Sequence, residues 1–324
     1  MNNQGSSNIK GPVLLLLTAF IWGTAFVAQS VGTEYMGPFT FNMSRSLLAG
    51  LFLLPVIAVF RRAGGSRTKD SVSGQEAPES RGAQRKTLLT GGVSCGVILF
   101  ISSNLQQIGI QYTTVGKAGF ITAMYIILVP VLSLFLHKKA GIKLWISVVV
   151  AVAGLYLLCM SGGGFSVNKG DVIIFLCAIA FSVHILTISY FSPKTNGVRM
   201  SCIQFWTSAV LSAVFMAVFE KPDFGAVLDA WLPVCYAGIF SSGVAYTLQI
   251  VGQREMNPTV ASLILSLESV ISAVAGWVIL REVMSPREIF GCILMFAAII
   301  LAQLPDRKPK NCHLSVGKTE IECF

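Results

Sequence analysis

The sequence has few charged residues for its length. Only 12% of its 324 residues are charged and 54% are hydrophobic, whereas an average soluble domain has about 25% charged residues. A chain with this balance has too little polar surface to cover a globule in water. The composition therefore excludes an ordinary water-soluble domain and indicates that most of the chain lies in lipid.

The sequence also lacks the common motifs of enzymes and metal sites. It contains no HExxH motif, no Walker A loop and no nucleophile elbow. We therefore expect that it is not an enzyme or an ATP-driven pump, and that it has no cofactor and no metal site. None of its eight cysteines forms a CxxC pair, and six lie in apolar segments, so we expect no disulfide framework.

Long apolar runs are abundant instead. A helix needs about 20 apolar residues to cross a bilayer, and it satisfies its own backbone hydrogen bonds in lipid, as an open sheet cannot. We predict an all-α integral membrane protein with ten transmembrane helices, at residues 12–31, 40–60, 88–110, 117–136, 143–160, 170–190, 200–219, 231–251, 258–280 and 287–304.

The positive charges indicate how these helices are oriented. With the N-terminus in the cytoplasm, 18 of the 24 lysine and arginine residues fall in cytoplasmic segments, five fall in external links and Arg45 lies inside a span. This bias predicts that both termini are cytoplasmic. We expect the chain to lie in the plasma (inner) membrane of a prokaryote. It also accounts for the net charge of +9, so we expect no nucleic-acid partner. Residues 61–87 are rich in Gly, Ser and charge and indicate a flexible cytoplasmic connector, and residues 305–324 form a polar cytoplasmic tail.

The two halves of the chain resemble each other. A shift of 143 places Leu105, Gln106 and Gly109 on Leu248, Gln249 and Gly252, and for the first helix a shift of 159 places Gly11, Val13, Leu17 and Ala19 on Gly170, Val172, Leu176 and Ala178. Each repeat then holds five helices, at 11–160 and 170–304. Because five is odd, the second copy enters the membrane from the opposite side. Two inverted repeats are typical of secondary transporters, which bind their solute near the middle of the membrane between the repeats.

Two stretches resemble a known family. The segment FIWGTAFV (20–27), followed by Arg45 in the second helix, and LESVISAVAGWVILREVMSPREIFGCILMFAAIIL (267–301) are similar to the opening and closing motifs of EamA-type transporters of the drug/metabolite transporter superfamily. The resemblance implies a 5+5 inverted arrangement of ten helices around a central cavity. It also implies movement of metabolites such as amino acids, often outward.

Two charges lie inside the predicted spans away from their ends, where a charge costs about 3 kcal/mol or more. Glu268 follows Pro258 by ten residues, which places it about 15 Å into the membrane. It can serve as a proton site or as a counter-charge to a substrate amine, or it can be a protonated group that caps a polar group on a neighbouring helix. Arg45 can neutralise a substrate carboxylate, pair with Glu268 or reach the interface by snorkelling.

Polar and aromatic residues on other spans complete the predicted pathway. The eighth span carries Ser242, Tyr246, Gln249 and Gln253 on one helical stripe, and Gln106 and Gln249 correspond in the two repeats. Such residues can line a cavity or form hydrogen bonds between helices, and His184 can relay protons or be a bonded structural group. The predicted pathway residues are Trp22, Arg45, Asn104, Gln106, Tyr125, His184, Gln204, Tyr246, Gln249 and Glu268, with Glu268 and His184 as possible proton-coupling sites.

The sequence therefore predicts a secondary transporter that moves small neutral or zwitterionic, amino-acid-like solutes by alternating access, with export as the expected direction. The expected partners are this solute and the lipid bilayer. Two alternatives stay open: an uncoupled facilitator or channel of the same fold, and a membrane scaffold or sensor that moves nothing.

Overall fold

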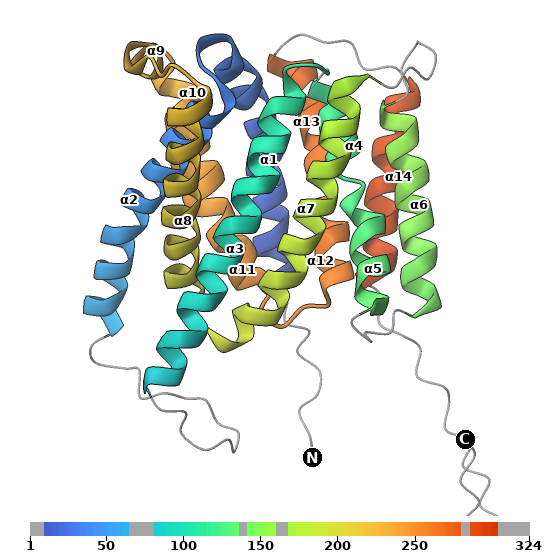
Figure 1. Ribbon diagram of the computed structural model, residues 1–324. Coiled ribbons are helices and arrows are strands. Elements are labelled where there is room, and N and C mark those ends of the chain that lie inside the picture. Colours follow the sequence, from blue (N-terminus) through green and yellow to red (C-terminus); the bar gives the residue numbers. More distant parts are fainter. Residues whose placement is uncertain are drawn as a thin grey trace, which may run out of the picture.

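The computed structural model describes residues 10–64, 81–113, 115–135, 141–159, 168–279 and 286–303. These residues form a bundle of helices with no strand among them (Figure 1). Most of the connector predicted at 61–87 and the tail at 305–324 lie outside the described residues. The described ends of the connector are helical, because the second helix continues to Gly64 and the third begins at Arg81.

The predicted all-helical membrane fold is confirmed. Among the described residues, seven helical stretches are long and apolar enough to span a bilayer, and three shorter apolar stretches, Ala118–Leu134, Ile142–Gly154 and Ile289–Ala298, fall in the other three predicted spans. Seven of the predicted spans are single helices, and six of these are α1 (Lys10–Tyr35), α2 (Pro38–Gly64), α3 (Arg81–Ile110), α6 (Ile142–Cys159), α7 (Lys169–Phe191) and α8 (Gly197–Phe219). The last span is α14 (Pro286–Gln303), and two short elements, η1 (Ser192–Lys194) and α9 (Phe224–Asp229), lie in connections.

The fourth and ninth spans are each broken into two helices, although the sequence predicted them as continuous. The fourth consists of α4 (Val115–Thr122) and α5 (Tyr125–Phe135), and the ninth of α12 (Pro258–Leu265) and α13 (Leu267–Ile279). The shift of 143 that relates the halves places Ala123, in the first break, on Ser266, in the second. Interrupted helices at corresponding positions of inverted repeats mark the binding region of many secondary transporters.

Local hydrogen bonds explain both breaks. The Met124 amide donates to the Ile121 carbonyl at 3.1 Å, and the Ser269 amide donates to the Ser266 carbonyl at 3.1 Å, so the chain tightens to i→i+3 bonding at these points. The Ser266 hydroxyl also donates to the Leu263 carbonyl at 2.7 Å, and a hydroxyl that bonds the backbone in this way bends a helix.

The eighth span departs from a regular α-helix. It runs through α10 (Trp231–Cys235), the π-helical segment η2 (Tyr236–Ala245) and α11 (Tyr246–Gly252). A π-helix is bonded from i to i+5, is rare, and is frequently found at functional sites. The α-helical spacing that the sequence predicted for this span therefore does not hold before Tyr246.

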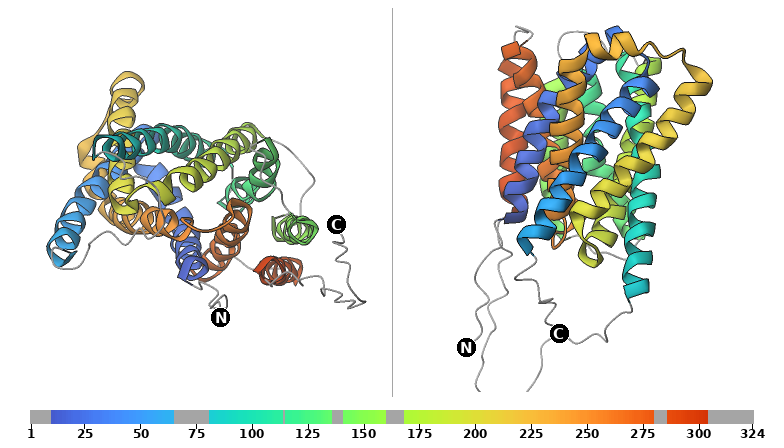
Figure 2. Two further views of the ribbon diagram at one scale, coloured as in Figure 1. Left: turned by 90° about the horizontal axis from the view of Figure 1, so that it is seen from below. Right: turned by 90° about the vertical axis from the view of Figure 1, so that its left-hand side faces the viewer.

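The helices pack as two intertwined halves. Helix α3 packs against α7 and α8, α2 packs against α8, and α1 packs against α13, so the contacts join helices of different repeats. Helices α6 and α14, the last of each repeat, lie side by side at one edge of the bundle (Figure 2).

Two glycine pairs allow helices of opposite repeats to touch backbone to backbone. A Cβ atom at Gly252 of α11 would lie 3.1 Å from the carbonyl oxygen of Gly11 in α1, and one at Gly170 of α7 would lie 2.8 Å from that of Gly109 in α3. Gly11 corresponds to Gly170 and Gly109 to Gly252 under the two shifts. The same crossing is thus made twice, once toward each end of the bundle.

A carboxylate joins α8 to the start of α2. Glu220, which follows α8, accepts hydrogen bonds from the backbone amides of Phe39 and Thr40, each at 2.8 Å, and from the Thr40 hydroxyl. The free amides at a helix N-terminus favour a negative charge. Glu220 therefore anchors the second and seventh spans to each other at this end of the bundle.

Candidate substrate site

A cavity lies between helices of both repeats, with about 440 Å³ of empty space when the solvent at its opening is included. It is bordered by α1, α2, α3, the broken helices, α7 and the eighth span, so both repeats contribute to its wall. The lining residues are Trp22, Phe26, Gln29, Arg45, Gln106, Thr122, Tyr125, Phe181, Ile185, Ser241, Tyr246, Gln249 and Glu268.

Most of this wall comes from corresponding positions of the two repeats, which we call repeat mates. The shift of 159 also places the first residue of α2, Pro38, on the first residue of α8, Gly197, so it holds for the first two helices of each repeat. Four pairs of mates line the cavity: Trp22 with Phe181, Phe26 with Ile185, Gln106 with Gln249, and Tyr125 with Glu268. The cavity therefore lies around the axis that relates the two halves.

The carboxylate of Glu268 lies at the break of the ninth span, in the first turn of α13. The side chain is 4% exposed, and Tyr125 donates its hydroxyl hydrogen to Glu268 Oε1 at 2.8 Å. Its place near the N-terminus of α13 also favours negative charge. Glu268 and Tyr125 are repeat mates, so this hydrogen bond joins the two broken helices across the axis.

Arg45 brings the opposite charge to the same cavity. Its side chain is 4% exposed, so it does not extend to the outer surface of the bundle, and its Cζ atom lies 6.0 Å from the centre of the Phe41 ring. No ion pair joins Arg45 to Glu268 in the described part of the chain. The cavity thus holds one guanidinium and one carboxylate that do not neutralise each other by direct contact.

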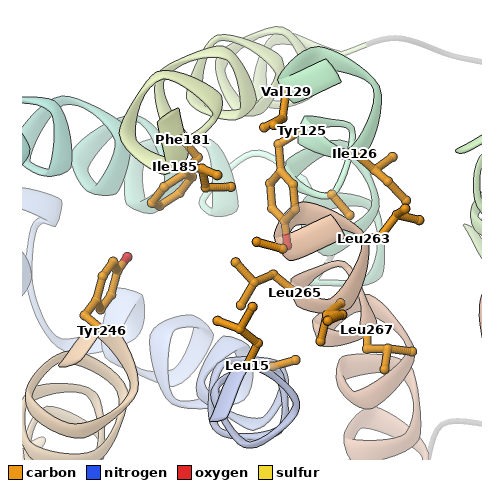
Figure 3. Packing of buried hydrophobic residues seen from close by; sticks show 14 of the residues in the cluster. Leu15, Tyr125, Ile126, Val129, Phe181, Ile185, Tyr246, Leu263, Leu265 and Leu267 are labelled. Carbon is orange, nitrogen blue, oxygen red and sulfur yellow. The ribbon is translucent and has the colours of Figure 1, made fainter. Parts of the chain in front are cut away.

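Aromatic side chains form the wall opposite the broken helices. The Trp22 and Tyr246 rings are 4.6 Å apart, and Trp22 Nε1 donates to the carbonyl oxygen of Ser241 at 3.1 Å. In Figure 3, Tyr125 and Tyr246 point their hydroxyl groups into the region that Phe181 and Ile185 border. Flat apolar walls with a few polar groups are typical of small-molecule pockets.

Amide side chains complete the polar part of the wall. Gln106 Nε2 donates to the Thr122 hydroxyl at 3.3 Å. The side-chain oxygens of Gln29 and Gln249 are buried and accept no hydrogen bond from the described residues. These two oxygens are left without a donor in this conformation of the described chain.

Three of the predicted pathway residues lie outside the cavity. Asn104 accepts a hydrogen bond from Asn42 at 3.0 Å and donates to the Phe100 carbonyl at 2.8 Å, which is the interhelical role that the sequence left open. His184 and Gln204 are fully buried and bond each other, with His184 Nε2 and Gln204 Oε1 separated by 3.3 Å. The other seven predicted residues are brought together at the cavity.

Six lining residues were not predicted, and the sequence holds a signal for most of them. Phe181 and Ile185 are the repeat mates of Trp22 and Phe26, and Phe26 and Gln29 follow Trp22 by four and seven residues, on one face of α1. Thr122 is the hydrogen-bond partner of Gln106, and no sequence pattern marks it.

The sixth, Ser241, follows from the π-helix. The α-helical stripe of the eighth span predicted Ser242, but Ser241 lines the cavity together with Tyr246, five residues later. Five residues is the π-helical interval.

Comparison with known proteins agrees with this architecture. The EamA-like transporter family model matches residues 9–160 and 168–304. An uncharacterized transporter of Archaeoglobus fulgidus is 30% identical over 93% of this chain and 88% of its own length. The uncharacterized transporter YetK of Bacillus subtilis is 25% identical over 92% and 89%, and the uncharacterized inner membrane transporter YedA of Escherichia coli is 22% identical over 88% and 87%.

A solved crystal structure shares the fold, with a TM-score of 0.71 at 18% identity over 92% of this chain and 97% of the other. Two family matches, one on each half, account for the paired breaks and for the repeat mates around the cavity. The chain therefore belongs to the EamA-like transporter family, and it is a multi-pass membrane transporter of the ten-helix, inverted-repeat fold.

Proposed function

We propose that this protein is a secondary transporter that exports small zwitterionic or neutral solutes of amino-acid-like chemistry by alternating access. The observation that carries this proposal is the central cavity, which is built from repeat mates at two broken helices and which contains one guanidinium and one carboxylate. Inner-membrane residence with cytoplasmic termini is part of the proposal; the name of the Escherichia coli relative and the charge bias of the sequence support it.

The charges of the cavity favour a zwitterion. Arg45 can bind a carboxylate through its planar fork of N–H donors, and Glu268 can accept hydrogen bonds from an ammonium group. A solute that carries both groups brings no net charge into the membrane. The oxygens of Gln29 and Gln249 supply further acceptors, and the Trp22 and Tyr246 rings offer an apolar surface for the rest of the solute.

The coupling step is assigned to Glu268. A carboxylate at the axis can take up a proton or a solute ammonium, and the two occupants compete for the same oxygens. Tyr125 bonds only Oε1 in this structure, so its hydrogen bond orients the carboxylate. Rocking of one repeat against the other would then expose Glu268 to each side in turn.

One observation favours the uncoupled facilitator as a second candidate. The hydrogen bond from Tyr125 gives Glu268 a structural partner, so the carboxylate can be retained for packing alone. A facilitator of this kind would keep its flux and its pH response after a Glu268→Gln change.

Counterflow into liposomes separates these functions. Purified protein is reconstituted, and uptake of a labelled panel of amino acids and related metabolites is measured at two pH values. Wild type is compared with Glu268→Gln and with Glu34→Gln, in which the changed residue lies on the exposed end of α1. We expect wild type and Glu34→Gln to exchange a zwitterionic solute with a pH-dependent rate, and Glu268→Gln to lose the pH dependence.

Each other outcome has a distinct meaning. Equal exchange by all three proteins at both pH values would contradict proton coupling through Glu268 and support facilitated diffusion. Exchange of anions alone would overturn the solute class. Failure of wild type to exchange any member of the panel would count against transport of this class of solute.

A further inference from the structure

The cavity extends toward one end of the bundle. Gln29 lies near the end of α1 and Arg45 near the start of α2, so both lie close to the turn between these helices. Their repeat mates, Ile188 and Gln204, flank the turn between α7 and α8 and are fully buried away from the cavity. The two turns lie at opposite ends of the bundle (Figure 1).

Inverted repeats give this asymmetry a meaning. In such transporters the two repeats exchange conformations when the site closes to one side and opens to the other. In the alternate conformation, Gln204 would then have the surroundings that its repeat mate Arg45 has in this one: it would line the cavity. This step rests on the proposed alternating-access function.

Gln204 is paired with a second polar group that the present cavity does not use. Its Oε1 atom lies 3.3 Å from Nε2 of His184, and both residues have no exposed surface. Gln204 Nε2 and His184 Nδ1 are buried without a hydrogen-bond partner among the described residues. Buried polar atoms without partners are costly and uncommon, so they point to a ligand or water that reaches them in another conformation.

The Tyr246 ring separates this pair from the cavity. It lines the cavity on one side, and the His184 ring packs edge-on against it with centroids 5.9 Å apart. Tyr246 follows directly after the π-helical segment η2, where a change of bonding register would carry the side chain around the helix axis. Its repeat mate in regular helix is Ser103, which is too small to screen Arg45 in the same way.

We propose that His184 and Gln204 form a second polar half-site, screened by Tyr246 in this conformation and presented to the solute when the cavity opens toward the turn between α7 and α8. The pair offers an imidazole and an amide, which bind the polar end of a solute by neutral hydrogen bonds. The solute is held by a fixed positive charge when the site opens toward Arg45 and by neutral groups when it opens toward Gln204.

Cysteine accessibility tests the proposal. Gln204→Cys, its mate Arg45→Cys and the lipid-exposed Val214→Cys on the same helix as Gln204 are made in a chain whose eight native cysteines are replaced by serine or alanine. A membrane-impermeant, positively charged methanethiosulfonate is added to right-side-out or to inside-out membrane vesicles. We expect Arg45→Cys to react about tenfold faster or more from one face, Gln204→Cys to show the same preference for the other face, and Val214→Cys to stay unlabelled.

A second variant tests the role of Tyr246. Tyr246→Ser copies the residue at the mate position, and we expect it to raise the labelling rate of Gln204→Cys from the Arg45 face by about tenfold. Labelling of the detergent-denatured chain establishes that each cysteine is reactive, and thermal unfolding establishes that the variant is folded.

Three results would overturn the half-site: no labelling of native Gln204→Cys from either face, labelling from the same face as Arg45→Cys, or a folded Tyr246→Ser variant that changes nothing. Counterflow of the wild-type protein is measured in parallel and reports on the proposed function separately. Flux without reciprocal labelling refutes the half-site alone. Reciprocal labelling without flux supports the half-site and counts against the transported solute class.

Discussion

The hydrogen bond between Tyr125 and Glu268 is the central contact of the site at the scale of single residues. It joins the same position of two repeats and the two broken helices at once. A charged acceptor strengthens such a bond, and a buried carboxylate that loses its donor carries the cost of an unsatisfied group. The bond therefore stabilises the packing of the fourth span against the ninth and fixes where the carboxylate points.

We predict that Tyr125→Phe lowers the free energy of unfolding by about 1–3 kcal/mol, because it strands the Glu268 carboxylate. In a Glu268→Gln background we expect the same change to cost about 1 kcal/mol or less, since a neutral amide is left instead. Reversible unfolding in mixed detergent micelles measures both, and Tyr35→Phe on an exposed residue is the matched control. Equal costs in the two backgrounds would show that the bond adds nothing to the fold.

Single residues of the site were partly predictable. Glu268 and Arg45 are conspicuous because a charge in an apolar run needs a reason, and both line the cavity. His184 and Gln204 have the same polar character but lie behind Tyr246. The polar character of these residues in apolar spans indicates that they lie inside the bundle. Whether such a residue lines the cavity depends on the position of the Tyr246 ring, which no spacing rule predicts.

At the scale of helices, the contact between α1 and α13 depends on a glycine. A Cβ atom at Gly23 would lie 2.6 Å from Cβ of Ile271 and 2.7 Å from the backbone oxygen of Glu268. A backbone atom cannot move aside as a flexible side-chain end can. Gly23 therefore sets the distance between the first helix and the helix that carries the carboxylate.

We predict that Gly23→Ala forces α1 and α13 apart and destabilises the protein by about 1–3 kcal/mol, the usual cost of overpacking. Displacement of Glu268 should also weaken solute binding in a direct binding assay. Gly141→Ala is the control, because a Cβ atom there meets no atom within 4 Å. If Gly23→Ala and Gly141→Ala have the same free energy of unfolding and the same affinity for the solute, the close approach at Gly23 does not contribute to stability or to binding.

The number and placement of the helices were predictable, because apolar length alone determines them. The interruptions were not, since hydropathy does not register a turn tightened by the Ser266 hydroxyl or a π-helical segment that keeps its apolar residues. The repeat shift would have related the two breaks to each other once either was known.

At the scale of the whole molecule, an even number of crossings returns the chain to the side where it began. The first residue of α1 and the last of α14 lie at the same end of the bundle in Figure 1. Which face of the membrane this end meets follows from the distribution of lysine and arginine.

We predict that both ends of the chain face the cytoplasm. An epitope placed at either terminus should resist protease in right-side-out cells and be cleaved in inside-out vesicles. An epitope inserted after Lys221, in the link that follows α8, should show the opposite pattern and serves as the control. The reverse pattern at all three sites would show that both termini lie outside the cell. A mixed pattern would contradict the ten membrane crossings.

The Tyr125–Glu268 contact also carries a record of ancestry. In a dimer of two identical five-helix chains, a residue on the twofold axis meets its own copy. A chain with identical repeats would place the same residue at both positions, and two carboxylates repel each other at hydrogen-bond distance. A tyrosine that donates to a glutamate requires two different residues at one position of the repeat, so this bond could arise only after the two repeats had diverged at that position.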